Sequence, residues 1–309
     1  MVVLDVALIL LASAQCGVFS STQAHQFGLS NQDLHRLARK GHLVRLCHGG
    51  YALPQALECA TADLRYLLTV RAAVLARPVR SWASHHAGLA VHGLPLHGVD
   101  TTSVDVCGRV TRRARSTGLE VHPLPEDEPC QVVGGIRVVS AALAVVQVAA
   151  RSVAGGLVAV DAALHGGLVS DAELTAAADR AGLGPRQRAR VAAVFGMADR
   201  SCESPGESLT RMLLSGLGLA FRTQVNLADS MGLIGRVDFL VGERVVVEFD
   251  GLVKYSGADG REALAAEKQR EDRLRAAGYE VVRLTWADLK DPERVARMIR
   301  QAAARSAAH

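Results

Sequence analysis

The sequence predicts a mixed α/β protein of several domains, with an N-terminal winged helix-turn-helix, a middle part rich in helices and a C-terminal α/β sandwich. Three observations predict it. Short helical segments and a hairpin pattern open the chain, alanine-rich helical segments fill its middle, and alternating β-formers near its end precede a charged helix and a further strand. The chain has 309 residues, 49% of them hydrophobic, enough for two or three cores. We expect domains at residues 1–77, 78–202 and 203–309.

The N-terminal domain reads as three helices followed by a wing. Val2–Ala14 is an apolar helix, and Ser20 or Ser21 caps a second helix that runs through His25. Ser30 and Asp33 fit a capping box that begins the third helix, and Gly41 ends it. Leu43–Leu46 and Tyr51–Leu53 then flank a turn at His48-Gly49. Three helices and a two-stranded wing predict a winged helix-turn-helix.

The third helix carries the candidate nucleic-acid contacts. Leu34 and Leu37 face inward, while Asn, Gln and Arg side chains of the outer face match base edges, and Arg39 and Lys40 suit phosphates. Residues 1–77 also hold seven Lys or Arg against four acids. The alternative is a polar face that touches only water or a partner protein. The residues expected to bind double-stranded DNA are Asn31, Gln32, His35, Arg36, Arg39, Lys40 and, on the wing, Arg45.

This part of the chain resembles the AbiEi family of abortive-infection antitoxins. The resemblance rests on Gly17-Val18-Phe19, on the small-residue second helix and on the run from Leu43 to Ala52. The segment from Ser84-His85-His86 to Leu94-Pro95 resembles the stretch that comes after the winged helix in such proteins. The resemblance implies a DNA-binding regulator with a toxin as partner.

The middle of the chain is the least informative part. Strands are expected around Thr102–Val106 and Leu119–His122, with four arginines between them that either grip phosphate or form a solvated hairpin tip. His85, His86 and His92 have no Cys or carboxylate at metal-ligand spacing, which predicts packing or capping. Four helical segments come next, near 141–151, 155–165, 170–181 and 186–199.

Near the C-terminus, a hairpin pattern carries three acids, Asp238, Glu248 and Asp250. Because side chains alternate along a strand, Glu248 and Asp250 share a face. If Gly242, Glu243 and Arg244 form a three-residue loop, Asp238 falls opposite Glu248; a two-residue loop would put these acids on opposite faces. Acids placed opposite each other predict a divalent cation, and the alternative is a solvated acidic edge.

The elements around this hairpin predict an α/β sandwich. A helix from Pro205 to Ser215 precedes the strands, a charged helix spans Arg261–Ala277, a buried strand spans Tyr279–Thr285, and Asp291-Pro292 opens a last helix. The order helix, strand, strand, strand, helix, strand, helix requires a parallel crossover.

The last hundred residues resemble the small endonuclease-like domain related to very-short-patch repair endonucleases, of the PD-(D/E)xK nuclease superfamily. The resemblance rests on Val-Glu-Phe-Asp-Gly at 247–251, the charged helix and the strand Tyr279–Trp286. It implies Mg²⁺ bound by Glu207, Asp238 and Glu248 and hydrolysis of a phosphodiester. Glu207 is alternatively a first-turn partner of the helix dipole.

One departure from that superfamily concerns catalysis. Asp250 stands where the superfamily has Lys, so Lys254 or Lys268 would have to supply the cation. We favour Lys268, because a helix holds a charge more rigidly than a loop. The six catalytic candidates are Glu207, Asp238, Glu248, Asp250, Lys254 and Lys268.

The sequence therefore supports two functions. One is a Mg²⁺-dependent DNA endonuclease, for phage defence or DNA repair, that a winged helix delivers to DNA. The other is an antitoxin-like transcriptional regulator with a catalytically degenerate nuclease fold. The six scattered cysteines predict reduced thiols without a structural zinc site. The apolar start lacks the features of a secretory signal and is too short to span a membrane, which predicts a cytoplasmic protein.

Overall fold

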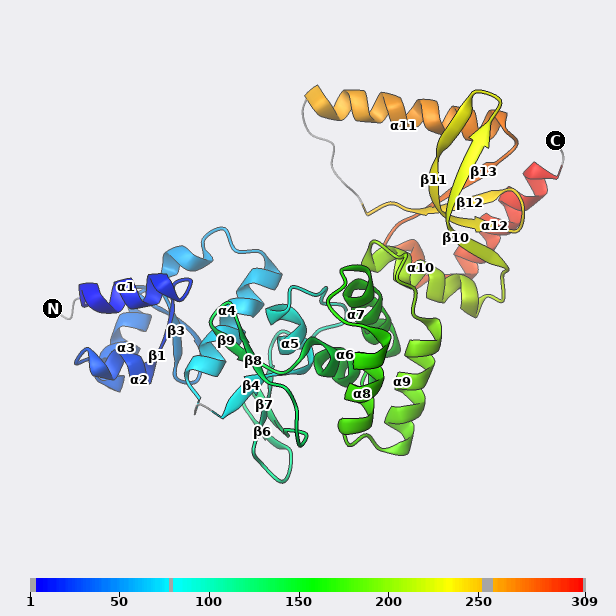
Figure 1. Cartoon of the computed structure of the whole chain (residues 1–309). Coiled ribbons are helices and arrows are strands. Elements are labelled where there is room, and N and C mark those ends of the chain that lie inside the picture. The colour runs from blue at the N-terminus through cyan, green and yellow to red at the C-terminus, as the bar shows by residue number, and fades with distance from the viewer. Residues whose placement is uncertain (1–3, 78–79, 252–257, 308–309) are drawn as a thin grey trace. The chain divides into compact units, whose positions relative to one another are not determined.

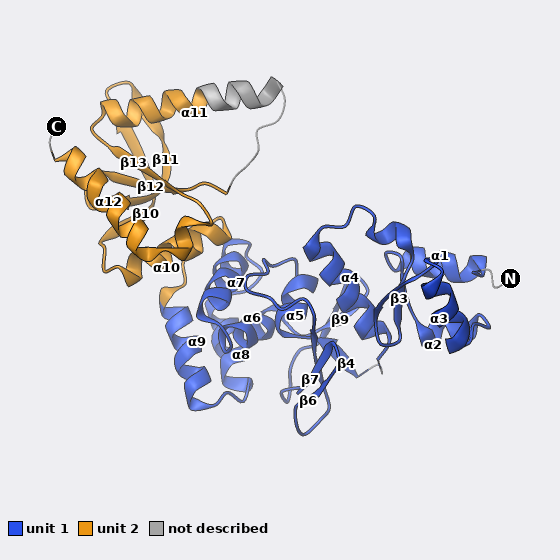
Figure 2. Cartoon of the chain, turned by 180° about the vertical axis from the view of Figure 1, so that it is seen from behind, with its two compact units in different colours: residues 1–196 blue, residues 197–309 orange. Residues whose placement is uncertain are grey.

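The structure is a computed structural model that describes residues 4–77, 80–251 and 258–307, with only the backbone of residues 258–265. The chain forms two compact units, Met1–Gly196 and Met197–His309 (Figures 1 and 2). Both units are mixed α/β, as the sequence predicts. The first unit contains the expected boundary at 77/78, and the second unit begins shortly before the expected boundary at 202/203.

The start of the first unit contains three helices and a three-stranded antiparallel sheet of order β1-β3-β2. Leu8, Phe19, Leu34, Leu43 and Tyr51 form its core. The capping box at Ser30 and Asp33 is confirmed, but no pattern in the chain indicates the strand β1. The elements are α1 (Val6–Ala14), β1 (Val18–Ser20), α2 (Ser21–Gln26), α3 (Asn31–Arg39), β2 (Val44–Cys47), β3 (Gly50–Ala52) and the 3₁₀ turn η1 (Pro54–Leu57).

A six-stranded mixed sheet comes next, of order β6-β7-β5-β4-β9-β8. The two strands expected here run parallel, so the arginines between them are not the tip of a simple hairpin. Instead β6 pairs antiparallel with β7, and Arg113 and Arg115 both pair with Glu120. The elements are α4 (Ala62–Leu75), β4 (Ser81–Ala83), α5 (His85–Val91), β5 (Val104–Gly108), β6 (Ala114–Ser116), β7 (Leu119–Pro123), β8 (Gln131–Val133) and β9 (Ile136–Val138).

The four alanine-rich helices are confirmed. Every residue of α6 is buried, because small side chains let neighbouring helices approach closely. At Gly156 of α7 an added Cβ would lie 2.4 Å from the Cα of Ala149, so that crossing has no room for a side chain. The helices are α6 (Ala141–Ala149), α7 (Val153–His165), α8 (Asp171–Arg180) and α9 (Pro185–Met197).

The second unit has the expected element order and the expected parallel crossover, because β12 and β13 pair in parallel. Its sheet has the order β10-β11-β12-β13. The elements are α10 (Pro205–Gly216), β10 (Phe221–Asp229), β11 (Gly232–Val241), β12 (Val245–Phe249), α11 (Ala258–Ala276), β13 (Glu280–Leu284), the 3₁₀ turn η2 (Asp288–Lys290) and α12 (Pro292–Ser306).

Helices cover both faces of this sheet. On one face Val245 and Val247 pack with Leu214 of α10 and Ile299 of α12. On the other face Val246 packs with Leu274 of α11. The alternation predicted for β12 is therefore confirmed, and it places Glu248, the acid of this strand, on the α11 side. None of the helices that the structure describes is long and apolar enough to cross a membrane.

Candidate functional site

The first candidate surface is the outer face of α3. Leu34 and Leu37 are buried, and the six polar residues expected on the opposite side are all exposed. Gln32, His35, Arg36 and Arg39 line one side of a shallow hollow of about 370 Å³, together with Asp33. These six residues are Asn31, Gln32, His35, Arg36, Arg39 and Lys40.

Contacts within this surface divide its residues into two groups. Arg36 donates to Asp33 at 2.5 Å, and His25 lies 3.1 Å from the Oδ1 of Asn31. Among the described residues, no ion pair engages Arg39 or Lys40. The C-terminal end of α3 therefore presents two cations without an acid on them among the described residues, and the middle of the helix presents one cation that an acid already holds.

Arg45 lies exposed on β2, as the wing assignment expects. Its Nε donates to the carbonyl of Cys47 at 3.3 Å, and its Nη2 lies 3.3 Å from Nδ1 of His48. These contacts hold the guanidinium against the turn of the wing, so its charge is presented at a fixed place on the strand.

The second candidate site is the acidic hairpin of the second unit. Val241 pairs with Val245 and Phe239 with Val247, so the three-residue loop is confirmed. Continuing this register puts Asp238 opposite Glu248 on one face of the sheet. The carboxylate of Asp238 accepts a hydrogen bond from the backbone N–H of Phe249 at 2.9 Å.

The environment of Asp238 is unfavourable for a charge. Burial is the main cause that raises its pKa, to about 6, and nearby Glu207 and Glu248 raise it further, while the Phe249 N–H opposes them. A carboxyl group tuned in this way is typical of functional sites as well as of strained acidic clusters.

Glu207 makes the contacts of a helix start. It is buried, and its Oε1 accepts from the Ser204 hydroxyl at 2.7 Å. Its Oε2 accepts from the Glu203 N–H at 3.1 Å and from the Gln224 side chain at 2.7 Å. Glu207 thus lies in the first turn of α10, as its alternative role beside the helix dipole expects. Glu207 is also close enough to Asp238 to raise the pKa of Asp238.

Arg270 of α11 contacts Glu248, a pairing that sequence reasoning missed. Its Nη2 donates to Oε1 of Glu248 at 2.6 Å and to the carbonyl of Arg236 at 2.8 Å. In the sequence Arg270 is one of many charged residues on this helix. Its contact with Glu248 arises only because α11 packs over the sheet. Lys268 is exposed, Asp250 is exposed, and Lys254 lies outside the described residues.

The three acids fit a magnesium ion in kind but not in their arrangement. Carboxylate oxygens are the ligands that Mg²⁺ prefers, at about 2.0–2.1 Å. Within the part of the chain that the structure describes, however, Glu207, Asp238 and Glu248 do not form a group whose ligand oxygens all lie within 4.8 Å of one another. One of them, Glu248, is instead paired with Arg270.

The comparison with known proteins concerns the N-terminal part of the chain. Residues 6–54 match the family model described as "Transcriptional regulator, AbiEi antitoxin". The matched range includes α3 and the strands of the wing. No curated protein matches the chain. The N-terminal part of this chain is therefore similar to an AbiEi antitoxin regulator domain.

Proposed function

We propose that this protein is a DNA-binding transcriptional regulator of the antitoxin type, which binds double-stranded DNA through α3 and the wing and has a toxin as partner. The exposed face of α3 carries the proposal, since Asn31, Gln32 and Arg39 offer the groups that hydrogen-bond base edges and phosphates. The match of residues 6–54 to the antitoxin regulator family supports it independently.

A salt titration tests the DNA contacts. Arg36→Ala with Arg39→Ala should weaken binding to a mixed-sequence 30-bp duplex and lower the slope of log affinity against log salt by about 1 to 2, because each phosphate contact contributes roughly 0.9 and Asp33 already pairs with Arg36. Fluorescence anisotropy between 50 and 200 mM salt measures both quantities. Binding should weaken more in Arg39→Ala than in Arg36→Ala, because Asp33 already neutralises Arg36.

The matched control removes the same charge elsewhere. Arg297 and Arg300 are also three apart and exposed, on α12. The double alanine variant at these two positions should keep the wild-type slope. If both double variants change the slope equally, the effect is one of net charge, and the α3 assignment is wrong.

Mg²⁺-dependent hydrolysis of DNA is the second candidate function, favoured by the placement of Asp238 opposite Glu248. The ion would supply Lewis-acid chemistry, with Glu207, Asp238 and Glu248 as its ligands. Against it stand Asp250 at the superfamily's Lys position and the Arg270 guanidinium on Glu248. The regulator with a catalytically degenerate nuclease fold is therefore our main proposal.

Plasmid nicking separates the two functions. We expect no nicking with Mg²⁺ by protein that binds duplex DNA. Nicking that stops with chelator, and that Asp238→Ala and Glu248→Ala each abolish, would establish the nuclease instead. In that case Lys268→Ala should lower turnover, whereas Glu243→Gln at the tip of the hairpin should not.

A further inference from the structure

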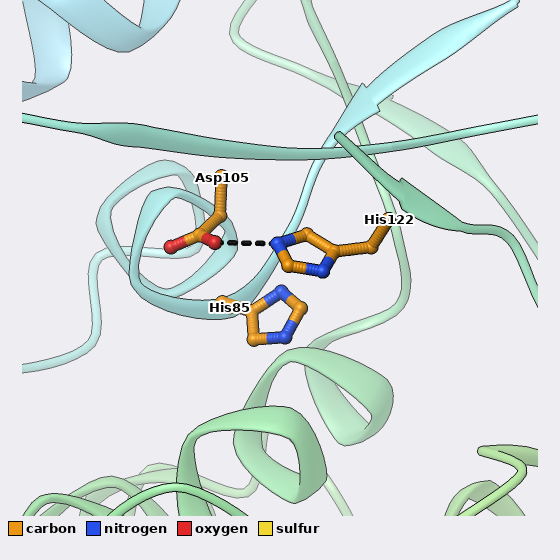
Figure 3. Close-up of side chains that lie close together, drawn as sticks. All are labelled: His85, Asp105 and His122. Atoms are coloured by element: carbon orange, nitrogen blue, oxygen red, sulfur yellow. Dashed lines mark hydrogen bonds and ion pairs between the residues drawn. The ribbon is translucent and has the colours of Figure 1, made fainter. Parts of the chain in front are cut away.

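The first unit brings together two histidines and an aspartate that lie far apart in the sequence. His85 begins α5, Asp105 lies on β5 and His122 lies on β7, and Figure 3 shows their side chains facing one another. One potential ligand atom of each lies within 4.8 Å of the others. Their exposed fractions are only 7%, 7% and 9%. Of the three histidines expected to lack a carboxylate partner, His85 therefore has one nearby, Asp105.

The sheet explains this meeting. Because β5 and β7 are parallel, with Asp105 opposite Glu120 and Cys107 opposite His122, Asp105 and His122 are diagonal neighbours on one face. His85 follows the adjacent strand β4 with a φ of +51°, in the left-handed region. Its N–H donates to the Gln147 side chain at 2.9 Å, which helps to hold that conformation. Backbone strain of this kind persists where the surroundings enforce it, often at functional sites.

The carboxylate of Asp105 is held between two partners. Its Oδ1 lies 2.7 Å from Nε2 of His122 and accepts from Nη2 of Arg151 at 2.9 Å, and the same Arg151 nitrogen lies 3.1 Å from Nε2 of His122. A metal ion needs an unprotonated imidazole nitrogen and a charged carboxylate. An ion there would replace the contact between His122 and Asp105 and displace Nη2 of Arg151, while Nη1 of Arg151 keeps its contact with Oδ2 of Asp105.

We propose that His85, Asp105 and His122 bind a divalent transition-metal ion, zinc by preference. Two imidazole nitrogens and one carboxylate oxygen are a donor set that zinc accepts, at about 2.0–2.2 Å. A tetrahedral site needs ligand atoms about 3.3 Å apart. The Nε2 of His122 and Oδ1 of Asp105, now 2.7 Å apart, would separate slightly.

The proposed ion has an open side. His85 and His122 both line a pocket of about 360 Å³, together with Gln147, Arg151 and Gln187 among others. Three protein ligands leave a fourth position, which in zinc sites of this type holds water or a substrate. The geometry is therefore that of an open site rather than a closed structural one.

The neighbouring charges hold the ligands in place. Arg151 donates to both oxygens of Asp105, at 3.0 and 2.9 Å, and so fixes the orientation of that carboxylate, as outer partners of metal ligands do. Glu120, which is buried and lies 3.5 Å from Arg151, also pairs with Arg113 and Arg115.

Metal titration of the full chain tests the proposal. After treatment with chelator, the wild type should bind one equivalent of Zn²⁺, and Co²⁺ should give the intense visible absorption of a four- or five-coordinate ion. His122→Gln and His85→Gln should each weaken zinc binding by at least about 100-fold, at or above the 10–100-fold cost of losing an outer partner.

His92→Gln is the matched control. His92 is also partly buried in the first unit, but its Nε2 lies 2.8 Å from the carbonyl of Val139, outside the cluster. This variant should bind zinc like the wild type. The proposal is overturned if the wild type binds less than one equivalent, if its cobalt spectrum is that of the hydrated ion, or if His92→Gln loses as much affinity as His122→Gln. The cobalt spectrum of the wild type decides the case even if a ligand variant fails to fold.

Discussion

Asp238 is a residue at which stability and the candidate site conflict. Its folded-state pKa of about 6 exceeds that of an unfolded Asp, so ionisation of this group favours unfolding, and the cost grows as pH rises from about 4 to about 6. The difference corresponds to at most about 3 kcal/mol, which solvent screening of a partly exposed group reduces to about 1–2 kcal/mol. Asp238→Asn should therefore stabilise the protein at pH 7.5, while its amide oxygen can still accept from the Phe249 N–H.

Urea unfolding measures this effect. The midpoint of Asp238→Asn should exceed that of the wild type at pH 7.5, and the gap should close at pH 4, where the wild-type carboxyl is protonated. Glu243→Gln removes an exposed acid from the same hairpin and should leave the midpoint unchanged at both values. The opposite result would be a variant midpoint that falls below the wild-type midpoint at pH 7.5 but not at pH 4. It would show that the fold favours the ionised form of Asp238.

At the scale of elements, α10 packs closely against the sheet at Gly206, a residue without a side chain. A Cβ added at Gly206 would lie 2.0 Å from ring carbons of Phe249, and this ring packs edge-on against Trp286 with centroids 4.8 Å apart. Gly206→Ala should cost about 1–3 kcal/mol through overpacking, although alanine is the better helix former by nearly 1 kcal/mol.

Gly216, at the other end of the same helix, provides the comparison. A Cβ there would meet nothing within 4 Å, so Gly216→Ala should be neutral or slightly stabilising in the same urea experiment. Two glycines of one helix should thus respond with opposite signs. Equal responses would mean that Phe249 and Trp286 yield to the added methyl group.

Local signals made most elements predictable from the sequence. The capping box at Ser30 and Asp33 depends on residues three apart, and the alternation along β12 depends on neighbours, so both are visible in the chain itself. The loop length at Gly242 was left open by the sequence, and the three-residue loop of the structure sets the register that places Asp238 opposite Glu248.

At the scale of the whole molecule, the partners that matter come from distant positions. Arg270 reaches Glu248 because α11 packs on the sheet, and His85 meets Asp105 and His122 because β4, β5 and β7 share one sheet. Single-sequence patterns carry no information on such pairings. β1 was missed for the same reason, because its three residues make a strand only beside β3.

The contacts of Glu207 bear on what an acid at this position says about function. At the start of α10 its carboxylate accepts hydrogen bonds from the Ser204 hydroxyl and the Glu203 N–H. It also accepts one from the Gln224 side chain of β10. Loss of these bonds would damage the fold whether or not the protein cleaves DNA. Selection for a folded protein is therefore sufficient to retain Glu207, and its presence alone is no evidence of nuclease activity. Whether Glu248 pairs with a metal or with an arginine is the more informative feature.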